Sequence, residues 1–244
     1  MSNAGLWNNL QEELAIQREC LDMMSAAWVA DYRSHGGSIF CGRGCRECCS
    51  LTVNCTLTEA VALAPLLSDS QAQAVAEYAI RLGGMMTPVT DLKEYLRMQR
   101  RDMGWCPLLE ADGACGIYAQ RPLSCRALLS TKESFYCGVD FADLSSEEKQ
   151  TYVESLDRTV TDFPLHYVAS TRETGGEMEA RSLTLMRQKF GFSLYGNMPV
   201  LVYLVREKGL AEAALVGREA VEAVAVQAGL AHPFLADFGG SDTL

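Results

Sequence analysis

The sequence predicts a mainly α-helical single domain with a small cysteine-rich metal-binding subdomain and a short β-hairpin. Three observations carry this prediction. Apolar residues recur at helical spacing over most of the 244 residues, and no strands alternate with helices as a parallel sheet requires. Ten cysteines, most of them clustered, fall within the first 137 positions. We expect a cysteine-cluster region with helices over 5–140 and a helical region over 141–244, packed in the same domain.

Composition narrows the function classes. The 21 basic residues against 31 acidic ones give a net charge of −10, which argues against a nucleic-acid or anionic-membrane partner. The apolar run at 198–205 is shorter than the roughly 20 residues of a membrane span. Residues 7–19 are too polar for a signal peptide, so we expect a cytoplasmic protein.

The first helix is expected over residues 8–30 and should end before Gly36-Gly37. The residues of its buried stripe are Leu10, Leu14, Leu21, Met24 and Trp28. Residues 51–57 then alternate between apolar and polar side chains, which predicts a short half-buried strand with Cys55 in the core. Thr58 is expected to cap the following helix. Further helical patterns occupy 59–82, with a break near 65–70, and 88–102.

A hairpin is expected in the middle of the chain, because Asp112-Gly113 lies between two apolar runs. A two-residue turn there pairs Glu110 with Cys115 and places Cys106 on the same face as Cys115. The two thiols would lie about 13 Å apart along the strand, so the hairpin alone does not bring them to one ion.

The remaining sequence is helical in character. Ser145 has the features of a helix N-cap, and Gly175-Gly176 is expected to interrupt a helix. Residues 209–230 form an Ala-rich amphipathic pattern.

The cysteines form two groups, and both groups suggest metal binding or redox chemistry. In a reducing compartment, clustered thiols bind metal or do redox chemistry more often than they form disulfides. Short spacings lower the entropy cost of bringing several sulfurs to one ion. The candidate metal ligands are Cys41, Cys45, Cys48, Cys49, Cys106, Cys115, Cys125 and Cys137.

Two arginines are candidate contacts of the bound group, Arg121 and Arg126, because a centre with four thiolates is anionic and needs nearby positive charge. An all-sulfur donor set suits either zinc or an iron–sulfur cluster, and the abundance of thiols favours the cluster. Cys20 is expected to be a core residue and His35 a loop residue rather than a ligand.

The stretch from Cys41 to Arg126 resembles the cysteine-cluster family with the motif C-x₂-C-x₂-C-C, which is described as zinc- or iron-chelating. Its most specific segment is Cys115-x-Ile117-Tyr118-x₂-Arg121-Pro122-x₂-Cys125-Arg126. Flagellin lysine-N-methylases are grouped with this family, so the resemblance implies metal binding and allows a protein-modifying enzyme that acts on a protein substrate. Three residues separate Cys41 from Cys45, where the family usually has two.

Three functions remain open at this stage. The centre can be part of a redox or modification enzyme, or it can be a structural zinc module that mediates protein interaction. The spacing Cys41-x₃-Cys45-x₂-Cys48 also occurs in radical S-adenosylmethionine enzymes. Against that alternative, Glu47 stands where those enzymes usually have an aromatic residue, and the strand–helix units of their barrel are missing.

Overall fold

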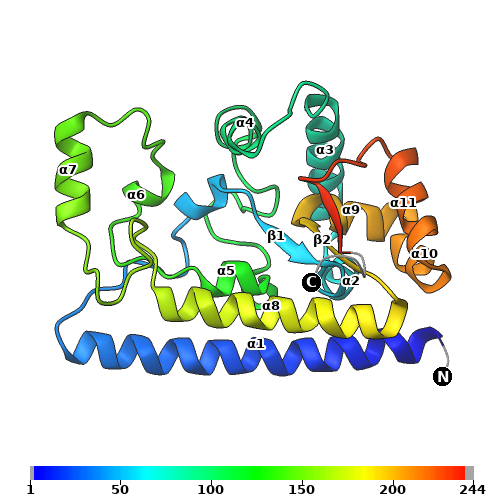
Figure 1. Ribbon diagram of the computed structural model, residues 1–244, viewed down its shortest axis with the longest axis horizontal. Coiled ribbons are helices and arrows are strands. Elements are labelled where there is room, and N and C mark those ends of the chain that lie inside the picture. The colour runs from blue at the N-terminus through cyan, green and yellow to red at the C-terminus, as the bar shows by residue number, and fades with distance from the viewer. Residues whose placement is uncertain (1–2, 240–244) are drawn as a thin grey trace.

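A computed structural model describes residues 3–239, and these contain eleven α-helices and one small antiparallel sheet. The mainly helical prediction is therefore confirmed. The two longest helices, α1 (Asn3–Ser34) and α8 (Ala169–Phe190), pack side by side and form the base of the molecule in Figure 1. The other elements lie on α8 and beyond its ends.

Helix α1 contains the predicted range 8–30 and continues beyond it at both ends. Leu10, Leu14 and Leu21 are buried as expected, but Met24 is 50% exposed. The prediction for Met24 is wrong because the buried stripe ends at Leu21: no later residue of α1 is buried, and Ser25 and Trp28 are only half-buried.

The core lies where α2 (Leu57–Leu63) and α3 (Asp69–Met85) both pack on α9 (Met198–Lys208). Every residue from Met198 to Leu204 is buried, so the long apolar run of the sequence is a core helix. A 3₁₀ turn at Ala64–Leu66 separates α2 from α3, at the predicted break. Thr56, not Thr58, is the N-cap of α2, and it forms a reciprocal capping box with Glu59.

The sheet has the order β1-β2-β3, with strands Asn54–Thr56, Ser193–Asn197 and Ala236–Gly239. Its central strand β2 pairs antiparallel with both neighbours. The predicted strand over 51–57 is therefore shorter than expected, although Cys55 is fully buried as predicted. Since the sheet joins segments from both halves of the chain, it ties them into one packing unit, while the boundary near residue 140 stays a prediction.

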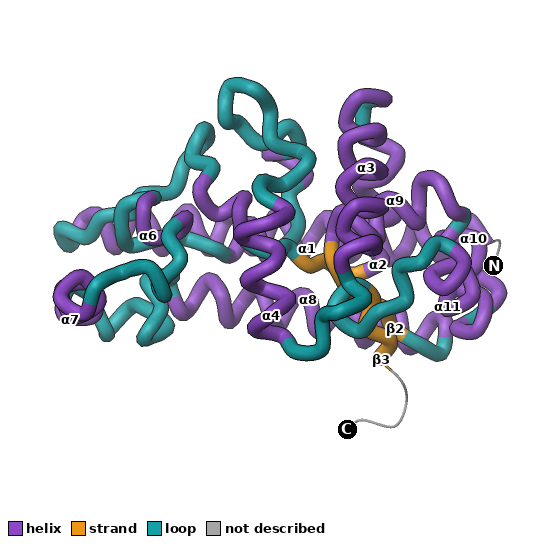
Figure 2. Tube along the Cα trace, turned by 90° about the horizontal axis from the view of Figure 1, so that it is seen from above, coloured by secondary structure: helices purple, strands orange, loops and turns teal. Residues whose placement is uncertain are grey.

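The remaining helices flank this core, and Figure 2 shows α7 at one end of the molecule and α10 and α11 at the other. Helix α7 begins after the Ser145 N-cap, as predicted. The Ala-rich segment is two helices rather than one, because Gly217 has a φ of +142° and ends the first. These elements are α4 (Leu92–Met98), followed by a π-helical turn at Gln99–Met103, α5 (Leu123–Ala127), α6 (Phe135–Gly138), α7 (Ser146–Glu154), α10 (Leu210–Val216) and α11 (Arg218–Gln227).

The expected break at Gly175-Gly176 is wrong, since both glycines lie inside α8. Gly175 permits close packing of α8 on α5, because a Cβ atom there would lie only 2.5 Å from the Cβ of Ala127. A Cβ atom at Gly176 would have no neighbour within 4 Å. The close contact between α5 and α8 therefore requires a glycine at position 175 of the helix, and the local sequence does not reveal this contact.

This difference predicts opposite effects of two adjacent substitutions. Gly175→Ala should lower the free energy of unfolding by about 1–3 kcal/mol, because α5 and α8 must separate. Gly176→Ala should raise it by about 0.5–1 kcal/mol, because alanine restricts the unfolded chain and clashes with nothing. Urea unfolding of both variants measures the difference, and equal stabilities would contradict the close packing of α5 on α8.

Candidate metal centre

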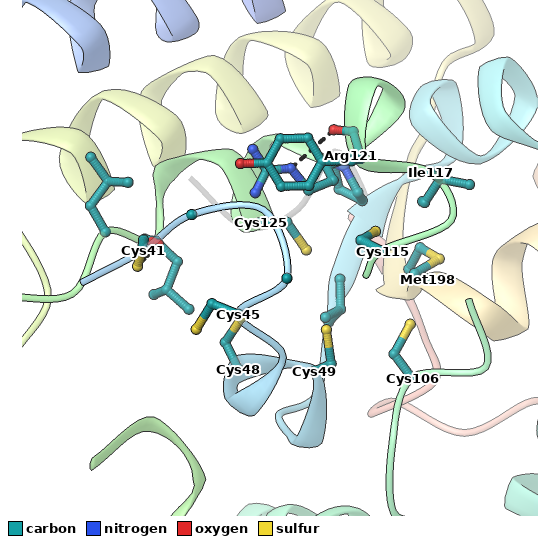
Figure 3. A pocket seen from close by; sticks show the side chains of 17 residues that line it. Cys41, Cys45, Cys48, Cys49, Cys106, Cys115, Ile117, Arg121, Cys125 and Met198 are labelled. Atoms are coloured by element: carbon teal, nitrogen blue, oxygen red, sulfur yellow. Dashed lines mark hydrogen bonds between the residues drawn. The ribbon is translucent and has the colours of Figure 1, made fainter. Parts of the chain in front are cut away.

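Seven of the eight cysteines predicted as ligands line one cavity of about 120 Å³, which Figure 3 shows from close by. Four come from the first group of cysteines and three from the second, which begins 57 residues after Cys49. The seven are Cys41, Cys45, Cys48, Cys49, Cys106, Cys115 and Cys125. Their convergence is a tertiary contact, so residues that are distant in sequence share one environment.

The first group lies on a loop followed by a 3₁₀ turn at Glu47–Ser50. The amide of Cys45 donates to the carbonyl of Gly42 at 3.1 Å, and Gly44 has a φ of +91°, so the chain turns tightly here. Cys48 and Cys49 lie within the 3₁₀ turn, and both line the cavity. Adjacent residues usually point to different sides, so the sequence did not predict this shared orientation.

The second group begins with a direct backbone link to the first, since the amide of Cys106 donates to the carbonyl of Cys49 at 2.8 Å. The predicted hairpin is reduced to a single bridge, Leu109 with Cys115, rather than Glu110 with Cys115. The two-residue turn is wrong because the amide of Glu110 bonds to Ala114, which leaves a three-residue loop with Gly113 at a φ of +82°.

Cys125 lies on α5, and a buried carboxylate anchors that helix. One oxygen of Glu59 accepts from the amide of Leu123 at 2.8 Å, and the other accepts from the amide of Thr56 at 2.9 Å. Glu59 is 1% exposed and therefore joins the first turns of α2 and α5 inside the core. Nothing in the local sequence indicates this link between the two helices.

Backbone amides already point at four of the sulfurs. The Sγ atoms of Cys45, Cys106 and Cys115 each accept an amide two residues further along the chain, from Glu47, Leu108 and Ile117. The amide of Ser130 donates to Cys41 Sγ at 3.1 Å. Such bonds favour the thiolate over the thiol, which is the form that binds metals.

Burial acts in the opposite direction and is the larger effect. It raises the pKa of Cys41 to about 11 and that of Cys106 to about 12. A hydrogen bond with the Cys49 thiol, together with burial, raises the pKa of Cys48 further. At neutral pH these side chains therefore keep their protons unless a positive centre replaces them.

Arg121 is the one charged residue among those that line the cavity. Its guanidinium lies 3.8 Å from the ring centroid of Tyr118, and its Nε donates to the Tyr118 carbonyl at 3.1 Å. Its charge lowers the pKa of Cys48, Cys115 and Cys125, against the effect of burial. Both the position and the charge of Arg121 therefore agree with the predicted contact with a bound group.

Arg126 is placed differently, since it is buried and does not line the cavity. Its Nε donates to the Arg121 carbonyl at 2.8 Å, and its terminal nitrogens bond to the Ala119 carbonyl and to Asp22 on α1. These contacts hold the backbone that carries Arg121. The predicted contact of Arg126 with a cofactor stays a prediction, and its observed partners indicate a supporting role.

The other sequence candidates do not line the cavity. Cys137 is buried and lies 3.3 Å from His166, measured from Sγ to Nε2. Cys20 is partly exposed on α1, and the His35 side chain is 73% exposed. Sequence reasoning overlooked His166, because no motif links it to a cysteine 29 residues away.

The donor set fits a thiophilic ion, because every candidate ligand in the cavity is sulfur and amides surround several of them. Across residues 3–239, no three side chains of His, Cys, Asp or Glu are close enough to hold one ion as they stand. Binding therefore requires the thiols to turn inward. Protonated thiols lack the attraction that would draw them together, whereas thiolates bound to a cation gain it.

Comparison with known proteins agrees with this assignment. Residues 40–152 match the model of the CxxCxxCC family, described as a putative zinc- or iron-chelating domain. The match includes all seven cavity cysteines and Cys137, and it confirms the resemblance seen in the sequence. No curated protein and no solved structure matches the chain.

Replacing Arg121 tests its electrostatic role. We expect Arg121→Met to weaken metal binding by about tenfold to a hundredfold, because the side chain faces the thiols and balances their charge. Arg43→Met is the matched control, since Arg43 also neighbours the cysteines in sequence but does not line the cavity. Competition with a chromogenic chelator gives both affinities, and equal losses in the two variants would refute a specific role for Arg121.

Proposed function

We propose that the CxxCxxCC domain at residues 40–152 holds an iron–sulfur cluster or zinc through thiolates drawn from the seven cavity cysteines. The convergence of two separate cysteine groups on one cavity carries this proposal. Metal binding itself agrees with the family description. The identity of the centre and its coordination by these residues are the proposed parts.

The spread of the thiols over two cysteine groups favours an iron–sulfur cluster over a lone structural zinc. Both kinds of centre take four cysteine ligands, and seven sulfurs line this cavity. The charge of Cys48 raises the pKa of Cys41 in the first group and of Cys106, Cys115 and Cys125 in the second, so this thiol interacts with both groups. A cluster, which spreads its ligands over several metal atoms, suits such a group better than one tetrahedral ion does.

An iron–sulfur cluster would supply one-electron chemistry, so we propose an oxidoreductase-like role in preference to a purely structural module. In that role Arg121 offsets the negative charge of the thiolates, and the surrounding amides stabilise them. A lysine-N-methylase-like activity on a protein substrate stays a prediction from the family resemblance. The alternative is a structural zinc module, and the metal content of the purified protein distinguishes it from an iron–sulfur cluster.

The radical S-adenosylmethionine alternative is weaker. Cys41, Cys45 and Cys48 do line one cavity, as that chemistry would need. However, the sheet formed within residues 3–239 has three short antiparallel strands, not the parallel strands of a strand–helix barrel.

None of the helices described over residues 3–239 has the length and apolar character needed to cross a bilayer.

The metal content of protein purified without oxygen tests the proposal. We expect bound iron with acid-labile sulfide and a brown colour, whereas colourless protein with zinc would favour the structural module. Cys106→Ser and Cys125→Ser should each lose most of the bound metal, because both side chains line the cavity. Cys20→Ser is the matched control and should keep it, since Cys20 lies on α1 outside the cavity.

Folded wild-type protein that binds neither iron nor zinc after anaerobic reconstitution would contradict the proposal. Equal metal content in all three variants would contradict the assignment of the ligands. Circular dichroism of each variant shows whether a loss of metal reflects a loss of the fold.

A further inference from the structure

A second group of possible metal donors is buried next to the cavity but outside it. Cys137 and His166 are only 4% and 3% exposed, and Cys137 Sγ lies 3.3 Å from His166 Nε2. The other ring nitrogen, Nδ1, lies 3.0 Å from the hydroxyl of Tyr152. Two hydrogen bonds from Thr131, one from its amide and one from its hydroxyl, hold the backbone carbonyl of His166 in place.

The hydrogen bonds determine which nitrogen of His166 carries the proton. The hydroxyl of Tyr152 also lies 3.2 Å from the carbonyl of Pro164, and a carbonyl can only accept. Tyr152 therefore gives its single proton to Pro164 and accepts from Nδ1–H of His166. The lone pair of Nε2 then points toward Cys137. An oxygen partner on the second ring nitrogen is also the usual arrangement around a histidine that binds a metal.

The separation of the two donor atoms suits a shared ion. Bonds to tetrahedral zinc of about 2.3 Å from sulfur and about 2.0 Å from nitrogen place two ligand atoms roughly 3.5 Å apart. The observed 3.3 Å lies close to this value. Nearly complete burial of both donors leaves little room for a substrate beside them.

Cys41 is the nearest source of a third donor. The amide of Ser130 donates to Cys41 Sγ at 3.1 Å, and the next amide, that of Thr131, donates to the carbonyl of His166 at 3.0 Å. Cys41 and His166 therefore contact neighbouring amides of one short segment. Cys41 would need to turn toward Cys137, as the cavity thiols need to turn toward their own centre.

We propose that Cys41, Cys137 and His166 bind a second ion, a thiophilic divalent cation such as zinc, apart from the centre held by the other six cavity cysteines. Both thiols release their protons on binding, and the neutral imidazole binds through Nε2. The ion would fasten the segment before α8, which carries His166, to the cysteine loop. This inference rests on the proposed function, since it assumes a centre in the cavity. The six other cavity cysteines are enough to hold that centre, which needs four thiolates.

Nuclear magnetic resonance of the intact chain tests this directly. Reduced, chelator-stripped wild-type protein with nitrogen-15-labelled histidine is loaded with cadmium-113 under anaerobic conditions. The chain has three histidines, His35, His166 and His232. We expect cadmium–nitrogen splitting at the Nε2 resonance of one histidine, which His166→Gln removes and His35→Gln leaves unchanged.

The possible outcomes separate this inference from the proposed function. Bound cadmium with no splitting at any histidine would refute the second ion while leaving the cavity centre intact. No bound cadmium at all would count against both. As a second readout, His166→Gln and Cys137→Ser should each lower the zinc content by about one ion per chain, whereas the matched controls His35→Gln and Cys20→Ser should not. Unchanged zinc content in the first pair would also overturn the inference.

Discussion

The crowding of seven half-buried thiols in one cavity is the constraint on which the rest of this structure depends. If they ionise without a cation, their charges repel one another at short range in a medium of low polarity. If they stay protonated, a core of weakly hydrogen-bonding side chains gains little from being kept together. Amides that point at the sulfurs and the guanidinium of Arg121 favour the ionised form. They lower the cost of ionisation, and a bound metal centre would supply the remaining positive charge.

The helical scaffold makes this crowding possible. Glu59 fixes the start of α5, which carries Cys125, and Arg126 fixes the backbone of Arg121 against Asp22 on α1. The backbone bond from Cys106 to Cys49 joins the two cysteine groups directly. Because these anchors come from helices that pack on one another, the positions of the cysteine loops depend on the tertiary fold rather than on local turns.

The sequence predicted correctly those features that depend on interactions between residues a few positions apart. The Ser145 cap and the break between α2 and α3 follow from hydrogen bonds and residue conformations within a few positions. The length of β1, the end of the buried stripe of α1 at Leu21, and the helical Gly175 follow from neighbours distant in sequence, so they were predicted wrongly. The candidate site shows the same division. The cysteines are visible in the sequence, whereas the proximity of His166 to Cys137 appears only once the chain is folded.

The central claim is that cysteines from both groups surround one metal centre. Thiol alkylation of the native protein with iodoacetamide, located by mass spectrometry before and after metal removal, tests it most directly. The account predicts that cysteines of both groups, including Cys48, Cys106 and Cys125, are protected together and become reactive together when the metal is removed. Protection that changes at the first group while Cys106, Cys115 and Cys125 react identically before and after removal would contradict it.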